Sequence, residues 1–252
     1  MIRKILLKIF LFLYKFTSLN KVFSIIKSIE KFESIEIDNN EKIFFLDTNW
    51  ITRFRLDTFY TKEPETINWI KNFHSGIFWD IGANIGLYSI YSSKLVKNLE
   101  VVAFEPSILN LEILIKNIYK NKKQENIKII TNPISNFNKF DYFYLSTIEK
   151  GGANSSFGKK ISNQISYKTN SLDCNNLKNI YNLDEPNYVK IDVDGNELEI
   201  LKSIFATFKN IESFLVEVNV DQEEIFSLME KNNYKLVFNK EDRTNKIWKK
   251  II

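Results

Sequence analysis

The hydrophobic positions of this chain follow two periods, one typical of β-strands and one typical of amphipathic helices. From residue 76 onward, short apolar runs alternate with longer stretches of helical spacing. Such alternation favours a parallel sheet with helices on both of its faces. The predicted strands are 77–81, 100–105, 127–130, 187–193 and 213–219, and the predicted helices between and after them are 85–97, 107–121, 195–208 and 222–233.

Both ends of the chain carry further strand patterns. Residues 32–38 and 42–47 flank a turn-like Asn-Asn-Glu, which predicts a hairpin, and 63–73 has the spacing of a helix. At the other end, 234–239 and 245–252 are joined by a polar turn and predict an antiparallel hairpin. A closing hairpin at one edge makes the predicted sheet mixed.

A long insertion separates the third and fourth strands of the predicted sheet. It contains the extended runs "FDYFYLS" and "QISYKTN" around the Gly- and Ser-rich "EKGGANSSFGKK". We interpret it as two strands around a mobile loop. A loop above the carboxyl edge of the sheet is a candidate lid over a binding site.

These patterns predict a single domain over 32–252, made of the hairpin and helix in 32–75 and a Rossmann-like core in 76–252. Residues 1–31 form a separate basic, apolar and helical segment with seven basic residues and one acidic residue. Its longest apolar run, 9–14, is far shorter than the roughly 20 residues that span a bilayer. The segment either lies at a membrane interface or packs on the domain.

Charge and cysteine content narrow the possible partners and the compartment. The chain has a net charge of +4, but residues 32–252 contain 28 basic and 30 acidic residues, which excludes a basic nucleic-acid-binding surface over the domain. Cys174 is the single cysteine, so no internal disulfide can form. A disulfide-free chain suits a reducing compartment, and we expect a cytoplasmic protein.

The stretch "FWDIGANIGLYS", residues 78–89, combines a strand end with two of the chain's seven glycines. Ligands of open α/β sheets bind outside the carboxyl ends of the strands, where glycines admit close backbone approach and helix N–H groups offer donors. A carboxylate at the end of the next strand can accept hydrogen bonds from ribose hydroxyls. The candidate cofactor residues are Asp80, Gly82, Ala83, Asn84, Gly86, Glu105, Pro106 and Ser107.

The same stretch discriminates between cofactors. A dinucleotide fingerprint requires G-x-G-x-x-G, and here those glycine places hold Gly82, Asn84 and Leu87. Asp80 offers a carboxylate to a ligand with a positive amino group. This combination favours S-adenosylmethionine over NAD, while a tight turn without any ligand is the alternative.

A second group of charged residues follows the fourth predicted strand, in "VKIDVDGNELE". Lys190 and Asp192 share one face of that strand, Asp194 lies just beyond, and Glu217 ends the neighbouring strand. We expect Asp192 or Asp194 to accept a hydroxyl proton, and Lys190 or Glu217 to set its charge and orientation. A salt-bridged structural cluster is the alternative, and magnesium is compatible with the carboxylates although their spacing does not require it.

Three other positions are weaker candidates. The lone histidine, His74, precedes the first core strand, and we expect a surface residue there. Trp50 lies in a loop-like stretch from which it could stack on a sugar ring. Glu197 and Glu199 belong to the helix after the acidic cluster, and we expect both to be solvated.

Five ordered stretches resemble the successive motifs of the FkbM-type methyltransferases: "FWDIGANIGLYSIYSS", "VVAFEPS", "TNSLDCNNL", "NYVKIDVDGNELEILKS" and "FLVEVN". The resemblance covers roughly residues 60–239. It implies a class I methyltransferase fold, S-adenosylmethionine as donor and O-methylation of a hydroxyl, often on a sugar or natural product. It also implies cofactor roles for Gly82, Asn84, Gly86 and Glu105. One departure is Asp194-Gly195-Asn196, where the family more often has Glu-Gly-Ala or Glu-Gly-Ser.

The leading hypothesis is therefore an O-methyltransferase that uses S-adenosylmethionine and acts on a hydroxyl of a glycan sugar or a small metabolite. Two alternatives remain open from the sequence. One is a non-catalytic, membrane-associated binding protein that keeps the fold, and the other is a nicotinamide-dependent oxidoreductase. Both glycines of the turn and the strand-end acids are present, which speaks against loss of the binding site. The sequence does not fix the oligomeric state.

Overall fold

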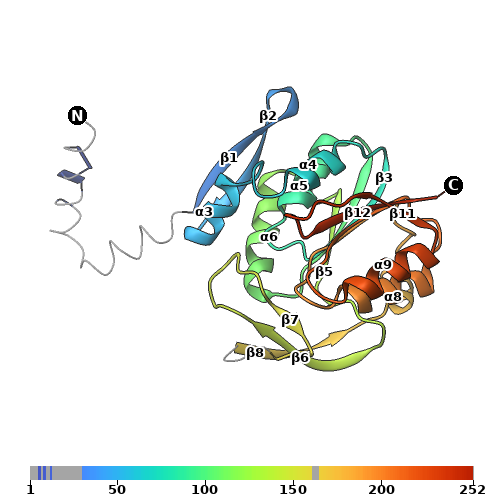
Figure 1. The fold of residues 1–252 in the computed structure, drawn as a ribbon. Coiled ribbons are helices and arrows are strands. Elements are labelled where there is room, and N and C mark those ends of the chain that lie inside the picture. Colours follow the sequence, from blue (N-terminus) through green and yellow to red (C-terminus); the bar gives the residue numbers. More distant parts are fainter. Residues whose placement is uncertain (1–4, 7, 10–11, 13–29, 161–164, 252) are drawn as a thin grey trace.

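A seven-stranded mixed sheet forms the centre of the computed structural model, which describes residues 5, 6, 8, 9, 12, 30–160 and 165–251 (Figure 1). The spatial order is β11-β12-β10-β9-β3-β4-β5. The pairs from β5 to β10 are parallel, and β12 runs antiparallel to both of its neighbours. The strands are β3 (Gly76–Ile81), β4 (Leu99–Phe104), β5 (Ile127–Ile130), β9 (Tyr188–Ile191), β10 (Ser213–Glu217), β11 (Tyr234–Phe238) and β12 (Asn245–Lys250).

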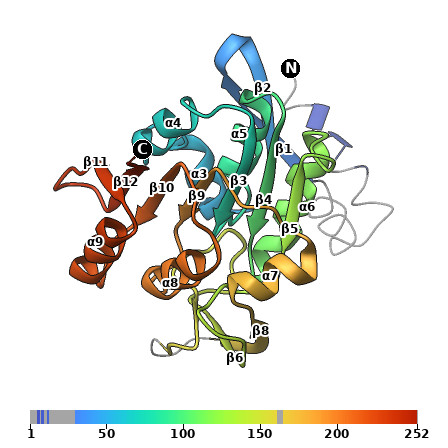
Figure 2. The same cartoon turned by 90° about the vertical axis from the view of Figure 1, so that its right-hand side faces the viewer.

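Helices cover both faces of this sheet, as the sequence pattern predicts (Figure 2). Successive strand residues point to opposite faces, so Phe78 packs in one core and Trp79 in the other, both fully buried. One face is covered by α4 (Pro64–Ile70), α5 (Leu87–Leu95) and α6 (Ile108–Lys120), and the other by α7 (Cys174–Tyr181), α8 (Glu197–Thr207) and α9 (Gln222–Lys231).

The predicted N-terminal hairpin is confirmed as β1 (Lys31–Ile37) and β2 (Glu41–Asp47), joined by the short 3-10 helix η1 (Asp38–Asn40). Its second strand lies against α6, where side-chain amides take the place of a neighbouring strand. Asn117 Oδ1 accepts the N–H of Leu46 at 2.8 Å, and Asn121 Oδ1 accepts the N–H of Phe44 at 2.9 Å. These bonds satisfy backbone donors that an open strand edge would leave unpaired.

The insertion folds as a separate three-stranded antiparallel sheet of order β7-β6-β8 (Figure 1). Its long strands, β6 (Lys139–Leu145) and β8 (Ile165–Ser171), match the predicted extended runs. The short β7 (Ser156–Phe157) lies within the stretch predicted as a mobile loop, so part of that loop is instead paired with β6.

Two helices of eight residues each were not predicted from the sequence, and each begins at a side-chain cap. Helix α3 (Trp50–Asp57) begins at a capping box in which Asn49 Oδ1 accepts the N–H of Thr52 at 2.9 Å. Helix α7 begins where Asp173 accepts the N–H of Asn176 at 2.8 Å. Trp50 was expected to lie in a loop. It is instead the first residue of α3.

The C-terminal hairpin is confirmed, but its place in the sheet is not the simplest one. Its last strand, β12, lies between β10 and β11. The chain therefore forms the edge strand β11 first and then places β12 beside β10. Most of the predicted N-terminal segment 1–31 lies outside the described residues, and its proposed boundary stays a prediction. Within the described part of the chain, no helix combines the length and apolar character needed to cross a membrane.

Substitution of Gly86 tests why the turn before α5 requires glycine. It has φ +85°, and a Cβ there would lie 2.5 Å from Leu114 Cδ1 of α6. We expect Gly86→Ala to lower the free energy of unfolding by about 3 kcal/mol, of which left-handed backbone accounts for about 1–2 and overlap for the rest. Urea titration measures this change.

Gly158→Ala is the matched control. Gly158 has a similar φ of +73°, but its added Cβ would only make ordinary contact with Asp141 at 3.4 Å. We expect this variant to lose about 1–2 kcal/mol. Equal losses for both variants would show that the contact with Leu114 does not constrain the turn.

Candidate active site

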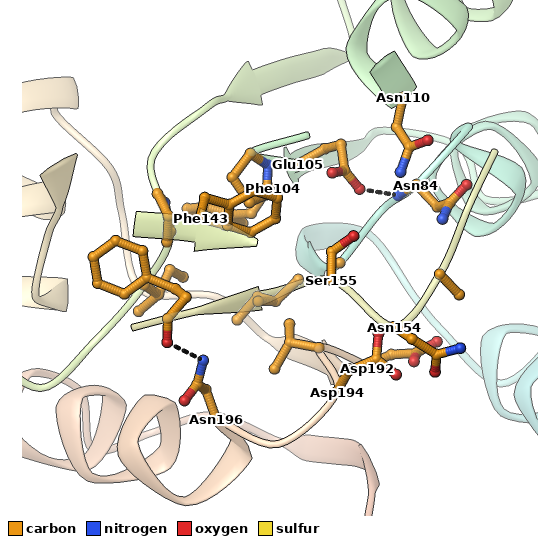
Figure 3. A pocket seen from close by; sticks show the side chains of 18 of the residues that line it. Asn84, Phe104, Glu105, Asn110, Phe143, Asn154, Ser155, Asp192, Asp194 and Asn196 are labelled. Carbon is orange, nitrogen blue, oxygen red and sulfur yellow. Dashed lines mark hydrogen bonds between the residues drawn. The ribbon is translucent and has the colours of Figure 1, made fainter. Parts of the chain in front are cut away.

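A cavity of about 330 Å³ opens at the carboxyl ends of β3, β4, β9 and β10, beneath the loop of the insertion (Figure 3). A narrow side pocket of about 40 Å³ adjoins it and is lined by Ala83, Tyr88 and Lys190 among others. Of the sequence-predicted residues, the large cavity is lined by Gly82, Asn84, Glu105, Pro106, Asp192, Asp194 and Glu217.

The turn after β3 requires glycine at position 82 because a neighbouring backbone segment leaves no room for a side chain. Gly82 has φ +86°, and a Cβ there would overlap the backbone carbonyl oxygen of Asp192. The end of β3 and the segment after β9 can therefore approach each other only because Gly82 lacks a side chain. Gly86 faces Leu114 and does not line the cavity.

Asn84 connects three parts of the site. Its backbone N–H donates to Glu105 Oε2 at 2.7 Å (Figure 3). Its Nδ2 donates to the carbonyl oxygen of Gly152 at 2.8 Å. Its Oδ1 is buried and has no hydrogen-bond partner among the described residues. A buried acceptor that lines a cavity in this way fits a donor group on a bound ligand.

Glu105 follows β4 and is 5% exposed. Its two carboxylate oxygens accept the N–H groups of Asn84 and Ser107, each at 2.7 Å. Burial raises the pKa of Glu105 to about 7, and these two hydrogen bonds oppose the rise. Ser107 is itself buried and acts through this N–H, outside the cavity wall.

Asp80 lies below the cavity and does not line it. It is 1% exposed, accepts a hydrogen bond from Ser89 Oγ at 2.5 Å, and is directly opposite Lys190 in the register of β3 and β9. Burial raises the pKa of Asp80, while the charge of Lys190 lowers it. The structure therefore places Asp80 under the acidic cluster, where it supports Lys190.

Lys190 and Asp192 form the centre of that cluster. Lys190 Nζ lies 2.5 Å from Asp192 Oδ2, and the Lys190 side chain is 1% exposed. Burial lowers the pKa of Lys190 and raises that of Asp192, but the charged partners together outweigh it: Asp192, Glu63 and Asp80 raise the pKa of Lys190, and Lys190 and Glu217 lower that of Asp192. The pKa of Asp192 falls to about 2, so this carboxylate is ionised whenever the pair is intact.

Glu217 approaches Asp192 from β10. The two carboxyl groups share a hydrogen bond, and Thr244 Oγ1 donates to Glu217 Oε1 at 3.1 Å. Burial, together with the negative charge of Asp192, raises the pKa of Glu217 to about 7. Two neighbouring carboxyl groups thus titrate several pH units apart.

Asp194 has a different environment from Asp192. It adopts φ +58° and accepts hydrogen bonds from the backbone N–H groups of Asn154 and Ser155 in the insertion. Glu197, which the sequence analysis expected to be solvated, is 1% exposed and accepts the N–H of Gly195 at 2.8 Å. The reason is that this first turn of α8 closes the loop after β9, where a free N–H needs an acceptor.

The loop predicted as a mobile lid is tied across the cavity by side chains from several elements. Arg55 Nε donates to the carbonyl oxygen of Gly151 at 2.8 Å, and Asn110 Oδ1 accepts the N–H of Gly151 at 3.0 Å. Asn196 Nδ2 donates to the carbonyl oxygen of Phe157 at 3.2 Å (Figure 3). We call residues 151–155 the strap.

Several polar residues of the cavity wall were not predicted from the sequence: Arg55, Lys62, Asn110, Asn132 and Asn196. Asn196 lies within the second motif and Asn110 follows Ser107 by three residues, whereas no local pattern marks the other three. The weaker candidates His74 and Trp50 are exposed, and neither lines the cavity.

Comparison with known proteins identifies the class. The model of the methyltransferase FkbM domain matches residues 80–236, more than half of the chain. The chain belongs to the FkbM methyltransferase family. The mixed, mostly parallel sheet with helices on both faces is the Rossmann-like fold that the sequence predicts.

Two curated relatives share 26% identity with the chain over 155 residues. The hexuronic acid methyltransferase AglP of Haloferax volcanii matches over 61% of this chain and 61% of its own length. The methyltransferase sdnD of Sordaria araneosa matches over 50% of this chain and 59% of its own length. The chain thus matches about 60% of the length of each relative.

The fold is also similar to solved structures at low identity. The precorrin-6y C5,15-methyltransferase of Geobacter metallireducens aligns with a TM-score of 0.46 and 16% identity, over 74% of this chain and 86% of that chain. TrmK of M. capricolum, solved with S-adenosylhomocysteine, aligns with a TM-score of 0.44 and 15% identity, over 73% and 67%.

Glu105 gives the site a testable pH dependence. Its folded-state pKa is raised above its ordinary value, so this group's contribution to stability is greatest at low pH and is lost as the pH rises to about 7. Ribose hydroxyls need the carboxylate as acceptor, so we expect affinity for S-adenosylhomocysteine to rise over the same interval. Calorimetric titration between about pH 5.5 and pH 8 measures this.

The variant Glu105→Gln serves as the comparison. It cannot titrate, so we expect weaker binding of S-adenosylhomocysteine with no pH dependence in this interval. A parent protein whose affinity is flat from about pH 5.5 to pH 8 would show that Glu105 does not contact the ligand as an ionised group.

Proposed function

We propose that this enzyme transfers the methyl group of S-adenosylmethionine to a hydroxyl of a glycan sugar or a small hydroxylated metabolite. The observation that carries the proposal is the hydrogen-bonded carboxyl pair at the cavity wall, in which Lys190 lowers the pKa of Asp192 while burial and the charge of Asp192 raise the pKa of Glu217. A hydroxyl acceptor must lose a proton during the transfer, and a group with a pKa near neutrality is suited to accept it. The relative named as a hexuronic acid methyltransferase supports a sugar acceptor.

The same pair leads us to propose roles that differ from the sequence expectation, in which Asp192 or Asp194 accepts the proton and Lys190 or Glu217 sets its charge. Glu217 acts as the base, because its pKa matches the pH at which it must take up a proton. Asp192, ionised beside Lys190, orients the acceptor hydroxyl and becomes the hydrogen-bond partner of the protonated Glu217. Asp194 holds the strap through Asn154 and Ser155 and so shapes the acceptor side of the cavity.

The residues that line the cofactor side match the proposed donor. Glu105 accepts hydrogen bonds from the ribose hydroxyls, and the buried Asn84 Oδ1 accepts one from the amino group. The apolar side chains of Phe104 and Ile134 contact the adenine ring. When bound, the donor supplies an electrophilic methyl group on a sulfonium. In-line placement of the acceptor oxygen lowers the barrier by about 7–11 kcal/mol, which is more than the base alone contributes.

The reaction takes place in the cytoplasm under this proposal, since Cys174 is a free, buried thiol and a reducing compartment preserves it. Contact of residues 1–31 with a membrane surface is a separate prediction from their basic and apolar sequence.

Calorimetric binding of S-adenosylhomocysteine tests the cofactor site first. We expect micromolar affinity, at least about tenfold weaker binding for Glu105→Ala, and nearly unchanged binding for Glu217→Gln. Turnover is then measured with sugars and hydroxylated metabolites by release of S-adenosylhomocysteine. Failure of the parent to bind S-adenosylhomocysteine would refute the proposed cofactor site, and failure to turn over any hydroxylated acceptor would refute the proposed acceptor class.

Glu217→Gln tests the base. We expect kcat to fall by about 10²- to 10⁴-fold, with affinity for S-adenosylhomocysteine retained. The parent's kcat should rise with pH through about 7 as Glu217 loses its proton, and this limb should be absent in the variant.

The control is Glu212→Gln at the opposite end of β10, where Glu212 accepts hydrogen bonds from Asn187 and Tyr188. It should keep the parent's pH profile. A Glu217→Gln variant that retains the limb near pH 7 would exclude Glu217 as the base.

A further inference from the structure

Arg55 is a cation at the cavity wall for which the described residues provide no ion pair. The other two arginines in the described part of the chain are paired. Arg53 forms salt bridges with Glu33 and Asp47, and Arg243 lies 4.0 Å from Glu65. Arg55 follows Arg53 by two residues in α3, so it projects from a different side of the helix, and it lines both the large cavity and its side pocket.

One hydrogen bond orients the guanidinium of Arg55, and its other N–H groups can still donate to a ligand. Its Nε donates to the carbonyl oxygen of Gly151 at 2.8 Å, which fixes the plane of the group against the strap. Neither of its terminal nitrogens has an acceptor within the described residues. Arginine presents these nitrogens as a rigid fork that matches the two oxygens of a carboxylate.

The two carboxylates near Arg55 already accept hydrogen bonds from backbone N–H groups. The positive charge of Arg55 favours the ionised forms of Glu105 and Asp194, so both lie in its field. Both, however, accept backbone N–H groups, from Asn84 and Ser107 in one case and from Asn154 and Ser155 in the other. The fork therefore has no carboxylate bound to it among the residues that the structure describes.

Lys62 adds a second positive charge at the same place. It lines both the cavity and the side pocket, and its charge lowers the pKa of Asp192. Its Nζ lies 3.0 Å from Glu63, so its own charge is partly balanced. Arg55 and Lys62 both precede β3, and the charge of Lys62 acts on Asp192 while that of Arg55 acts on Glu105 and Asp194.

We propose that Arg55, with Lys62 beside it, binds a carboxylate of the acceptor, so that the substrate is a hydroxy acid such as a sugar acid. This inference rests on the proposed hydroxyl methylation and adds a second, anionic anchor point to the acceptor. A planar carboxylate fits the fork in a bidentate manner, which fixes the rotation of the acceptor as well as its position. Fixing both is what in-line transfer to one particular hydroxyl requires.

Binding to the full chain saturated with S-adenosylhomocysteine tests this. The probes are matched pairs, methyl β-D-glucuronide with methyl β-D-glucoside and D-galacturonate with D-galactose, titrated by ligand-observed NMR. We expect at least one acid to bind about tenfold or more tightly than its neutral partner. Arg55→Gln should remove this preference, and Arg55→Lys should keep part of it because the charge remains without the fork.

Arg53→Gln is the matched control, because it removes the neighbouring arginine that contacts Glu33 and Asp47 and does not line the cavity. It should retain the preference for the acid. Thermal unfolding of all variants with S-adenosylhomocysteine confirms that each is folded before its affinity is compared.

Three outcomes would overturn the inference. The first is equal binding of acids and neutral partners, and the second is an unchanged preference in Arg55→Gln. The third is that Arg55→Gln weakens S-adenosylhomocysteine but not methylthioadenosine, which lacks the amino-acid carboxylate; the fork would then hold the cofactor's carboxylate. A parent that does not bind S-adenosylhomocysteine at all would instead refute the proposed cofactor site.

Discussion

The buried ion pair between Lys190 and Asp192 is the interaction on which the site depends. An ammonium that is 1% exposed in the central strand β9 would be strongly disfavoured without a charged partner. Asp192 follows β9 directly and lies two residues after Lys190, on the same face of the strand. Its N–H donates to the carbonyl oxygen of Ile81 at 3.0 Å, and its own carbonyl oxygen lies against Gly82, so the glycine turn and the acidic cluster adjoin each other.

The pair also separates the chemistry of two neighbouring carboxyl groups. Lys190 stabilises the charge on Asp192, and that charge in turn disfavours a second negative charge on Glu217. One group thereby remains ionised while the other titrates near neutrality. A single buried lysine thus determines which carboxyl can exchange a proton with a substrate, although the lysine itself lies beneath the large cavity, in its side pocket.

The insertion becomes part of the site through hydrogen bonds to its backbone. Arg55, Asn84, Asn110 and Asp194 each bind a backbone group of the strap, and they come from different elements around the cavity. A loop crossing a cavity has no strand or helix to satisfy its N–H and carbonyl groups, so side chains must do so. The residues that surround the ligand therefore also hold the cover over it.

The sequence by itself determined the layered α/β fold, because burial imposes a period on strands and helices. It also indicated the two strand ends that carry the glycine turn and the acidic cluster, because parallel strands end at one edge of the sheet. It did not reveal α3 and α7, which begin at side-chain caps, or the burial of Glu197. Only the tertiary structure decided the proton affinities of Asp192 and Glu217, the contact that makes Gly82 necessary, and the approach of Arg55 to the cavity. These depend on desolvation and on contacts between residues far apart in the chain, which no local pattern encodes.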